Sequence, residues 1–296
     1  MNILYISSLS YPFHAYISTE FYHALSVKHN VTYFDYYAED GINSLDKFLL
    51  AVKLIQPNVI LFDIYKAPIK AIVSFATWAQ RKVNCITVLW ENNNDIDEEP
   101  LSNIDIILST CTVNRVLKYG DRIVPFIPGI SAKNLLPDSS TQIYDVGICA
   151  DWNVEHSSIY DLAVLLKCCG KSLVFFGDKW KQINDFSNTL SMATLFGDEL
   201  MVELNSVKLC LVNTWGYSDI RYAWHVILSA LLSSAKIKIF DDEKLAKQFN
   251  LFNLEEENAV LKIGNIDNDK SELTKKIKSE YSWTNRVDQL ESILYR

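Results

Sequence analysis

Residues 209–242, LCLVNTWGYSDIRYAWHVILSALLSSAKIKIFDD, predict a strand, a tight loop, a buried helix and a second strand. Leu209–Asn213 is an apolar run of strand length, and Lys236–Phe240 is the matching run after the helix. Ser218 or Asp219 is expected to cap the helix between them. A buried strand that is followed by a helix and another strand indicates a parallel sheet covered by helices.

The predicted helix is apolar on most of its circumference, which is typical of a buried helix. Polar residues nevertheless recur at every fourth position along it: Arg221, His225, Ser229 and Ser233. Such a stripe must face a cleft, water or buried partners, because an unpaired buried polar group costs about 1–3 kcal/mol. Arg221 lies in the first turn, where the helix dipole disfavours a cation. An anion held by the helix start and Arg221 would explain this, and so would a pair with Asp219 or another carboxylate.

The composition indicates a globular protein of two domains. The chain has 296 residues, of which 49% are hydrophobic and 22% are charged, and its net charge is −8. No basic patch stands out in the sequence, so duplex DNA and anionic membranes are not the expected partners. The six cysteines form no C-x-x-C pair and share no metal-ligand spacing with the five histidines. The first residues predict a strand rather than a signal peptide, so we expect a cytoplasmic protein without a membrane span.

Apolar runs and helical patterns alternate along the whole chain, and the alternation restarts after a linker. Residues 128–142, PGISAKNLLPDSSTQ, are rich in Pro, Gly and Ser and mark the boundary. The predicted fold is therefore α/β, with two doubly wound Rossmann-like domains that face each other across a cleft. We expect an N-terminal domain at 1–130 and a C-terminal domain at 143–281. A final amphipathic helix at 282–296 is expected to return to the N-terminal domain.

Ligands of open parallel sheets bind at the carboxyl ends of the strands, so the loops there hold the candidate residues. These loops are Ser7–Pro12, Asp63–Lys66 and Glu91–Glu99 in the first half, and Asp151–His156, Gly177–Trp180 and Trp215–Asp219 in the second. The chain contains no G-x-G-x-x-G, no P-loop, no G-x-S-x-G and no H-E-x-x-H sequence. Nothing therefore predicts a dinucleotide cofactor, a metal or an acyl-transfer triad.

Two of these loops carry charged residues that could bind a ligand or act as a base. Gly177 permits a close turn, Lys179 offers a cation and Trp180 a flat ring, which together suit a phosphate or a stacked base. An ordinary strand-to-helix turn with a solvated lysine explains the same residues. In the acidic loop, Glu91 and Asp95 lie nearest the end of a buried strand, where a general base would be placed. The later acids of that loop fit a solvated face.

The second half resembles the GT-B-fold glycosyltransferases, especially the spore-maturation (CgeB-like) type. Members of that family show an Asn-x-Arg-x-Phe-Glu-Ala-x-Ala-x-Gly helix after a strand that ends in Asn. Here Cys210–Asn213 ends in Asn, Asp219-Ile220-Arg221 stands at Asn-x-Arg, and Trp224-His225 stands at Phe-Glu. The likeness covers most of residues 144–296. In the first half it concerns architecture alone, apart from a fainter resemblance to phage DNA β-glucosyltransferase at Asp95-Ile96 with Pro100.

The resemblance implies a metal-independent, hexosyltransferase-like enzyme without a bound cofactor, whose donor is a nucleotide-diphosphate sugar, with a UDP-sugar favoured. It assigns the donor to the C-terminal domain. There Arg221 and the backbone amides near Ser218 and Asp219 would stabilise the leaving diphosphate. His225 would contact the ribose or, if protonated, a phosphate. The remaining donor-binding candidates are Trp215, Gly177, Lys179 and Asn153.

In the N-terminal acceptor domain, Asp95 would deprotonate the acceptor hydroxyl, with Glu91 as the second candidate base. The acceptor is unknown and can be a glycan, a protein or a modified base. His225 replaces the family's helix acid, and one extra residue separates it from Arg221. That departure motivates one alternative, a nucleotide-sugar-binding protein without catalysis. A sugar-nucleotide epimerase of the same fold and a DNA-base glycosyltransferase also stay open.

Overall fold

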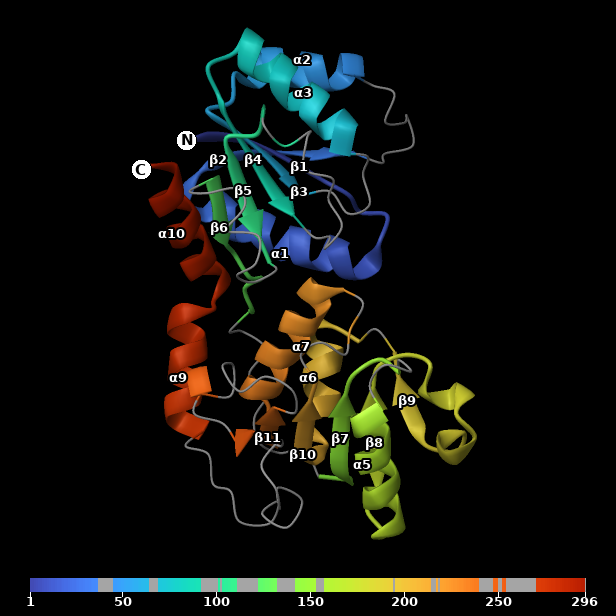
Figure 1. Cartoon of the computed structure of the whole chain (residues 1–296). Helices are drawn as coiled ribbons and strands as arrows, with labels where there is room; N and C mark the ends of the chain where they lie inside the picture. The colour runs from blue at the N-terminus through green and yellow to red at the C-terminus, as the bar shows by residue number, and fades with distance from the viewer. Residues whose placement is uncertain are drawn as a thin grey trace. The chain divides into compact units, whose positions relative to one another are not determined.

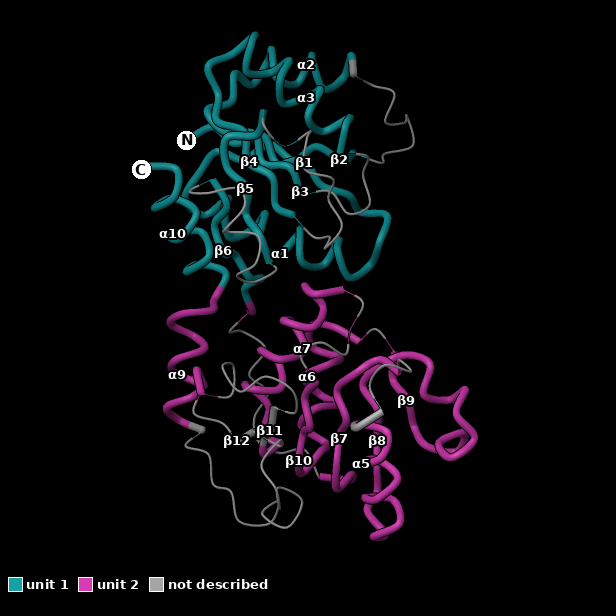
Figure 2. Tube along the Cα trace, in the orientation of Figure 1, with its two compact units in different colours: residues 1–129, 283–296 teal, residues 130–282 magenta. Residues whose placement is uncertain are grey.

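A computed structural model gives the structure of the chain, and two parallel sheets dominate it (Figure 1). It describes residues 1–36, 45–63, 69–91, 101, 103–110, 122–131, 142–152, 157–193, 195–213, 217, 219–239, 247–249, 252–253 and 270–295. The residues divide into two compact units, one of Met1–Gly129 with Trp283–Arg296 and the other of Ile130–Ser282 (Figure 2). Each unit holds one six-stranded sheet, which confirms the predicted α/β class with two Rossmann-like domains.

The sheet of the first unit has the strand order β2-β1-β3-β4-β5-β6, and every neighbouring pair is parallel. Its strands are β1 (Asn2–Ser7), β2 (Asn30–Asp35), β3 (Val59–Asp63), β4 (Ile86–Glu91), β5 (Ile106–Ser109) and β6 (Ile123–Pro125). The strands β1, β3 and β4 are continuous buried runs, as expected of strands that helices cover on both faces. Their carboxyl ends meet at one edge of the sheet.

Helices cover both faces of this sheet. Helices α2 (Leu45–Ile55) and α3 (Ile69–Lys82) lie on one face, where Phe48, Val52 and Ile72 join the core of the sheet. Helix α1 (Pro12–Lys28) begins with a proline, whose fixed φ suits a first helical turn. It lies on the other face together with α10 (Trp283–Leu294), from the far end of the sequence.

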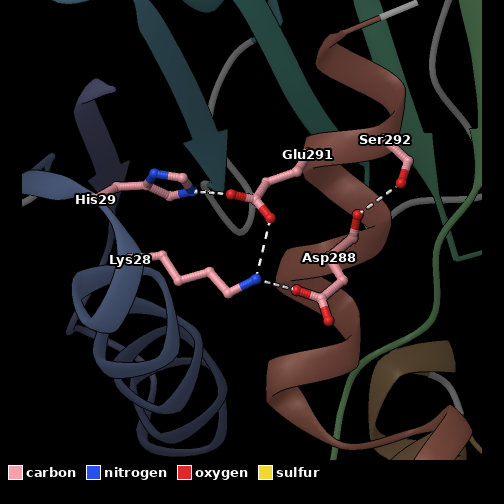
Figure 3. Close-up of polar contacts among 5 residues, drawn as sticks. All are labelled: Lys28, His29, Asp288, Glu291 and Ser292. Carbon is pink, nitrogen blue, oxygen red and sulfur yellow. Dashed lines mark hydrogen bonds and ion pairs between the residues drawn. The ribbon is translucent and has the colours of Figure 1, made fainter.

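Polar contacts join α10 to the end of α1 (Figure 3). Lys28 donates to the Asp288 carboxylate and, at 3.1 Å, to Glu291. The other carboxylate oxygen of Glu291 lies 3.2 Å from Nε2 of His29. Ser292 Oγ donates to the Asp288 backbone carbonyl at 2.9 Å, within α10 itself. Apolar packing accompanies these contacts, because the ring of Trp283 stacks on Phe21 of α1 with centroids 5.5 Å apart.

The sheet of the second unit has the order β12-β11-β10-β7-β8-β9, again with parallel pairs throughout. Its strands are β7 (Tyr144–Cys149), β8 (Leu173–Phe176), β9 (Leu190–Met192), β10 (Val207–Val212), β11 (Lys236–Ile239) and β12 (Phe252–Asn253). Its helices are α5 (Ser157–Cys168), α6 (Gly197–Asn205), α7 (Ile220–Leu232) and α9 (Lys270–Glu280), with two short 3-10 turns, Trp180–Gln182 and Asn184–Phe186. The segment 209–242 that decides the fold thus supplies β10, α7 and β11.

Candidate functional site

The start of α7 is the predicted anion site of the second unit, and its own cap residue occupies part of it. Asp219 has extended backbone angles, and its carboxylate accepts from the backbone N–H of Arg221 at 2.9 Å and of Tyr222 at 3.2 Å. Of the two predicted caps, Asp219 thus serves, while Ser218 and Trp215 lie outside the described residues. A bound anion would share this helix end with a carboxylate and would depend on a cation nearby.

The polar stripe of α7 is buried along its whole length. The exposed fractions are Arg221 0%, His225 1%, Ser229 0% and Ser233 2%. Nε2 of His225 accepts from the backbone N–H of Gly197, the first residue of α6, at 3.2 Å. Beyond the stripe, the Ser234 N–H donates to Asn205 at the far end of α6 at 2.7 Å. The stripe from His225 onward therefore faces a neighbouring helix, one of the possibilities that the sequence left open.

Burial also fixes the charge of His225. It lowers the pKa of this imidazole to about 3, so the ring is neutral at physiological pH. Because Nε2 accepts a hydrogen bond, the remaining proton belongs on Nδ1. A neutral histidine does not offer a phosphate the charge that its protonated form would. A ribose contact from His225 stays a prediction.

The glycine loop after β8 is shaped by packing. A Cβ on Gly177 would lie 1.9 Å from the Ala150 carbonyl oxygen, so only glycine fits between the ends of β7 and β8. Trp180 is fully buried, stacks on Phe175 at 4.1 Å and donates Nε1–H to the Ala150 carbonyl at 2.7 Å. The prediction that the Trp180 ring is available to stack on a nucleotide base is therefore wrong, because the ring is packed in the core. Lys179 is exposed at a left-handed φ of 68°, and Asn153 lies outside the described residues.

In the first unit, buried polar residues end four neighbouring strands. They are Ser7 of β1, Asp63 of β3, Glu91 of β4 and Ser109 of β5, with exposed fractions of 1%, 1%, 4% and 2%. The register pairs Ser7 with Asp63 and Glu91 with Ser109 across neighbouring strands. Two carboxylates and two hydroxyls therefore lie along the carboxyl edge of one sheet, where ligands of such sheets bind.

Asp63 is the centre of a buried hydrogen-bond network. Its Oδ2 accepts from the Tyr5 hydroxyl at 2.5 Å and from Ser18 Oγ of α1 at 2.8 Å. Ser18 in turn accepts from Ser7 Oγ at 2.7 Å. The sequence placed Asp63 at the start of a candidate loop without giving it a role. The signal was an acid that closes a fully apolar strand, because a buried carboxylate needs hydrogen-bond donors.

Glu91, one of the two candidate bases, follows a firmly held residue. Trp90 is fully buried and meets the rings of Phe21 and Phe126 edge-on at 5.3 and 5.2 Å. Its Nε1–H donates to Thr110 Oγ1 at 3.0 Å. These contacts fix the end of β4 and so the backbone position of Glu91. Asp95, the other candidate base, lies outside the described residues, as does the rest of the acidic loop at 92–100.

Within the described ranges, no three His, Cys, Asp or Glu side chains gather in a way that could hold a metal ion. A search of the same ranges finds no helix long and apolar enough to cross a membrane.

Comparison with known proteins identifies the fold. No protein-family model matches the sequence, and no curated protein sequence matches it. Among solved structures, the chain is similar to the DNA-modifying enzyme β-glucosyltransferase, solved with and without its substrate uridine diphosphoglucose. The TM-score is 0.60 at 12% identity, and the match covers 100% of both chains. This protein has the GT-B fold.

Two further structures agree. The trehalose-6-phosphate protein from E. coli, bound with UDP-2-fluoro glucose, matches with a TM-score of 0.61 at 11% identity, over 100% of this chain and 99% of that one. The N-terminal domain of the trehalose-6-phosphate phosphatase from Candida albicans matches with 0.58 at 10% identity, over 99% and 96%. At these identities the likeness concerns the fold, and residue roles must be argued from this chain's own side chains.

Proposed function

We propose that this protein is a glycosyltransferase that moves a sugar from a nucleotide-diphosphate sugar, with a UDP-sugar favoured, to an acceptor hydroxyl. The observation that carries the proposal is the GT-B fold over the whole chain, shared with two structures solved with UDP-glucose or its 2-fluoro analogue. The CgeB-like type and a cytoplasmic location are part of the same proposal, and they rest on the sequence.

In this proposal the second unit, which corresponds to 143–281, binds the donor at the carboxyl edge of its sheet. Arg221 would neutralise the negative charge that develops on the leaving diphosphate. Its positive charge would also offset the negative charge of Asp219, the cap of the same helix. Arg221 is fully buried in the first turn of α7, the position at which the sequence predicts an anion. Ser218, Trp215, Gly177, Lys179 and Asn153 complete the proposed donor loops, and neutral His225 would supply at most a hydrogen bond to the ribose.

The first unit, with 1–130 and the helix of 282–296, would bind the acceptor. A carboxylate at the carboxyl edge of its sheet would take the proton of the acceptor hydroxyl as that oxygen attacks the sugar carbon and the bond to the diphosphate breaks. Asp95 is the first candidate for this base, and Glu91 is the second. Glu91 is buried at the carboxyl end of β4, with 4% of its surface exposed.

The test is a donor assay on the full chain with substitutions at both edges. UDP release from UDP-glucose, with and without candidate acceptors, measures turnover, and calorimetry with UDP measures donor binding. Arg221→Lys and Arg221→Ala should lower UDP affinity, while Asp95→Asn or Glu91→Gln should stop transfer and leave UDP binding intact. Circular dichroism checks that each variant folds. Unchanged turnover of the Arg221 variants would refute the proposed donor site. If Glu91→Gln stops transfer and Asp95→Asn does not, Glu91 is the base and Asp95 is not.

One observation favours a second candidate function. The helix acid of the resembling family is replaced by His225, whose Nε2 is already used by the Gly197 amide. A protein that binds a nucleotide sugar without transferring it would need no ribose acid of that kind. Binding of UDP-glucose in calorimetry, with no UDP release in the presence of glycan, protein or DNA acceptors, would support this alternative. Release of free sugar or an epimer without acceptor would instead identify an epimerase.

The likeness to β-glucosyltransferase also keeps DNA among the acceptors to be tested. A net charge of −8 is unfavourable for tight duplex binding. Transfer to DNA would depend on local Lys and Arg contacts to phosphates and should weaken as salt rises. Transfer of labelled glucose to duplex DNA that carries a hydroxymethylated base, measured across a salt series, distinguishes a DNA acceptor from a glycan acceptor.

A further inference from the structure

A groove of about 520 Å³ lies between α2 and α3 of the first unit. It is lined by Asp46, Leu49, Leu50, Val52, Lys53, Gln56, Trp78, Lys82 and Val83. On α2 the lining residues follow helical spacing from Asp46 to Lys53, which corresponds to a length of about 10 Å, and Gln56 follows the end of the helix. Gln56 and Val83 each lie just before a strand, β3 and β4, so the groove reaches the amino edge of the sheet. Asp63 and Glu91 end the same strands at the opposite edge.

The walls of the groove combine apolar and cationic groups. Leucine, valine and tryptophan side chains form its apolar part, and Leu50 keeps 54% of its surface exposed. Lys53 and Lys82 are exposed in the last turns of α2 and α3, and both line the groove. The single acid of the lining, Asp46, belongs to the first turn of α2, about 10 Å along the helix from Lys53. One end of an apolar groove therefore carries two ammonium groups.

This arrangement favours one class of occupant. An apolar chain would cover the exposed leucine surface, which is costly to leave in water. An anionic head would lie between the two lysines, whose alkyl stems pack on apolar groups while their charges stay in solvent. A cationic amphiphile would meet two like charges, and a neutral one would leave both lysines without a partner.

We propose that the groove between α2 and α3 binds a free single-chain amphiphile with an anionic head, such as an aliphatic carboxylate, whose chain lies along α2. The site is separate from the proposed donor and acceptor edges and does not depend on the glycosyltransferase proposal. Its volume lies within the range of small-molecule pockets, roughly 300–1,000 Å³.

The test titrates the full chain with dodecanoate below its micelle concentration and follows heat and tryptophan fluorescence. Dodecanoate should bind one molecule per chain, and dodecyltrimethylammonium should not bind. The double change of Lys53→Glu and Lys82→Glu should weaken dodecanoate binding about tenfold or more. Lys70→Glu, an exposed lysine of α3 outside the lining, is the matched control and should bind as the unchanged protein does.

A second variant locates the chain of the ligand. Trp78→Phe should keep dodecanoate binding in calorimetry and remove most of the fluorescence change, because Trp78 lines the groove. Equal binding of the cationic and anionic amphiphiles, or full binding by the double-lysine variant, would overturn the proposal. So would the absence of saturable binding. Binding to anionic phospholipid vesicles without binding to free dodecanoate would also overturn it, because it would assign this face to a membrane surface.

Discussion

The carboxyl edges of the two sheets are built differently, although the sheets share one architecture. In the first unit, side chains bond to one another around a buried carboxylate, as Tyr5 and Ser18 do with Asp63. In the second unit, side chains bond to backbone carbonyls: Trp180 donates to Ala150, and the Tyr217 hydroxyl donates to Phe176 at 2.6 Å. The first arrangement suits a site that handles protons. The second produces a more rigid edge, on which the proposed donor would bind with little rearrangement.

The largest expected effect tests the rigidity of the second edge. Gly177→Ala places a Cβ 1.9 Å from a backbone oxygen, which cannot turn aside as a side chain would. We expect unfolding free energy to fall by about 3 kcal/mol or more in urea titrations.

Gly170→Ala is the matched control. Gly170 has a φ of 74° with no atom within 4 Å of the new Cβ, so only backbone strain of about 1–2 kcal/mol is expected. Equal losses for the two variants would show that the close approach at Gly177 does not hold this edge.

The next effect tests the carboxylate of the first edge. Asp63→Ala removes the acceptor of the Tyr5 and Ser18 hydroxyls in a buried place, and we expect about 2–3 kcal/mol of stability to be lost. Asp63→Asn keeps an acceptor oxygen and should cost less. Thermal and urea unfolding of both variants measure the difference. If alanine costs no more than asparagine, the hydrogen bonds at Asp63 do not hold the edge.

The sequence predicted most of the fold because the strands are continuous apolar runs bounded by clear breaks. Val59–Asp63 is an example, since every residue of this strand is buried. The edge strand β9, Leu190–Met192, has no comparable apolar run. That strand is defined by pairing with β8, with Phe176 opposite Met192, and pairing between distant segments leaves no local signal.

The features of the candidate site also differ in whether the sequence could predict them. The cap at Asp219 follows from residue type and position, so the sequence could predict it. The partner of His225 is the amide of Gly197, 28 residues away, and only the packing of α6 against α7 brings them together. Asp63 draws its donors from β1 and α1, far from it in the sequence, so its network was not predictable from a local pattern.

A smaller effect concerns pH and tests whether the buried imidazole of His225 is neutral in the folded protein. The pKa of His225 is about 3 in the folded protein and about 6.5 in an unfolded chain, so the unfolded state binds more protons between these values. The stabilising effect of this neutral histidine is present above pH 6.5 and is lost as pH falls toward 3. Between pH 7 and 5 we expect a loss of about 2 kcal/mol from this group.

His225→Gln should remove that part of the pH dependence while an amide oxygen still accepts from Gly197. Urea unfolding at pH 5, 6 and 7 compares the slopes, and His23→Gln, at an exposed position on α1, is the control. Identical slopes for His225→Gln and the unchanged protein would show that folding does not lower the pKa of this imidazole.

The smallest effect compares one change at two buried serines. Ser229 of α7 is fully buried, and its hydroxyl has no hydrogen-bond partner in the described part of the chain. Ser229→Ala removes an unsatisfied hydroxyl and adds a better helix former, so stability should stay equal or rise by up to about 1 kcal/mol. Ser18→Ala in the first unit breaks two hydrogen bonds and should lower stability by about 1–2 kcal/mol. A loss of the same size at both serines in urea unfolding would mean that the second edge also depends on bonds between its side chains.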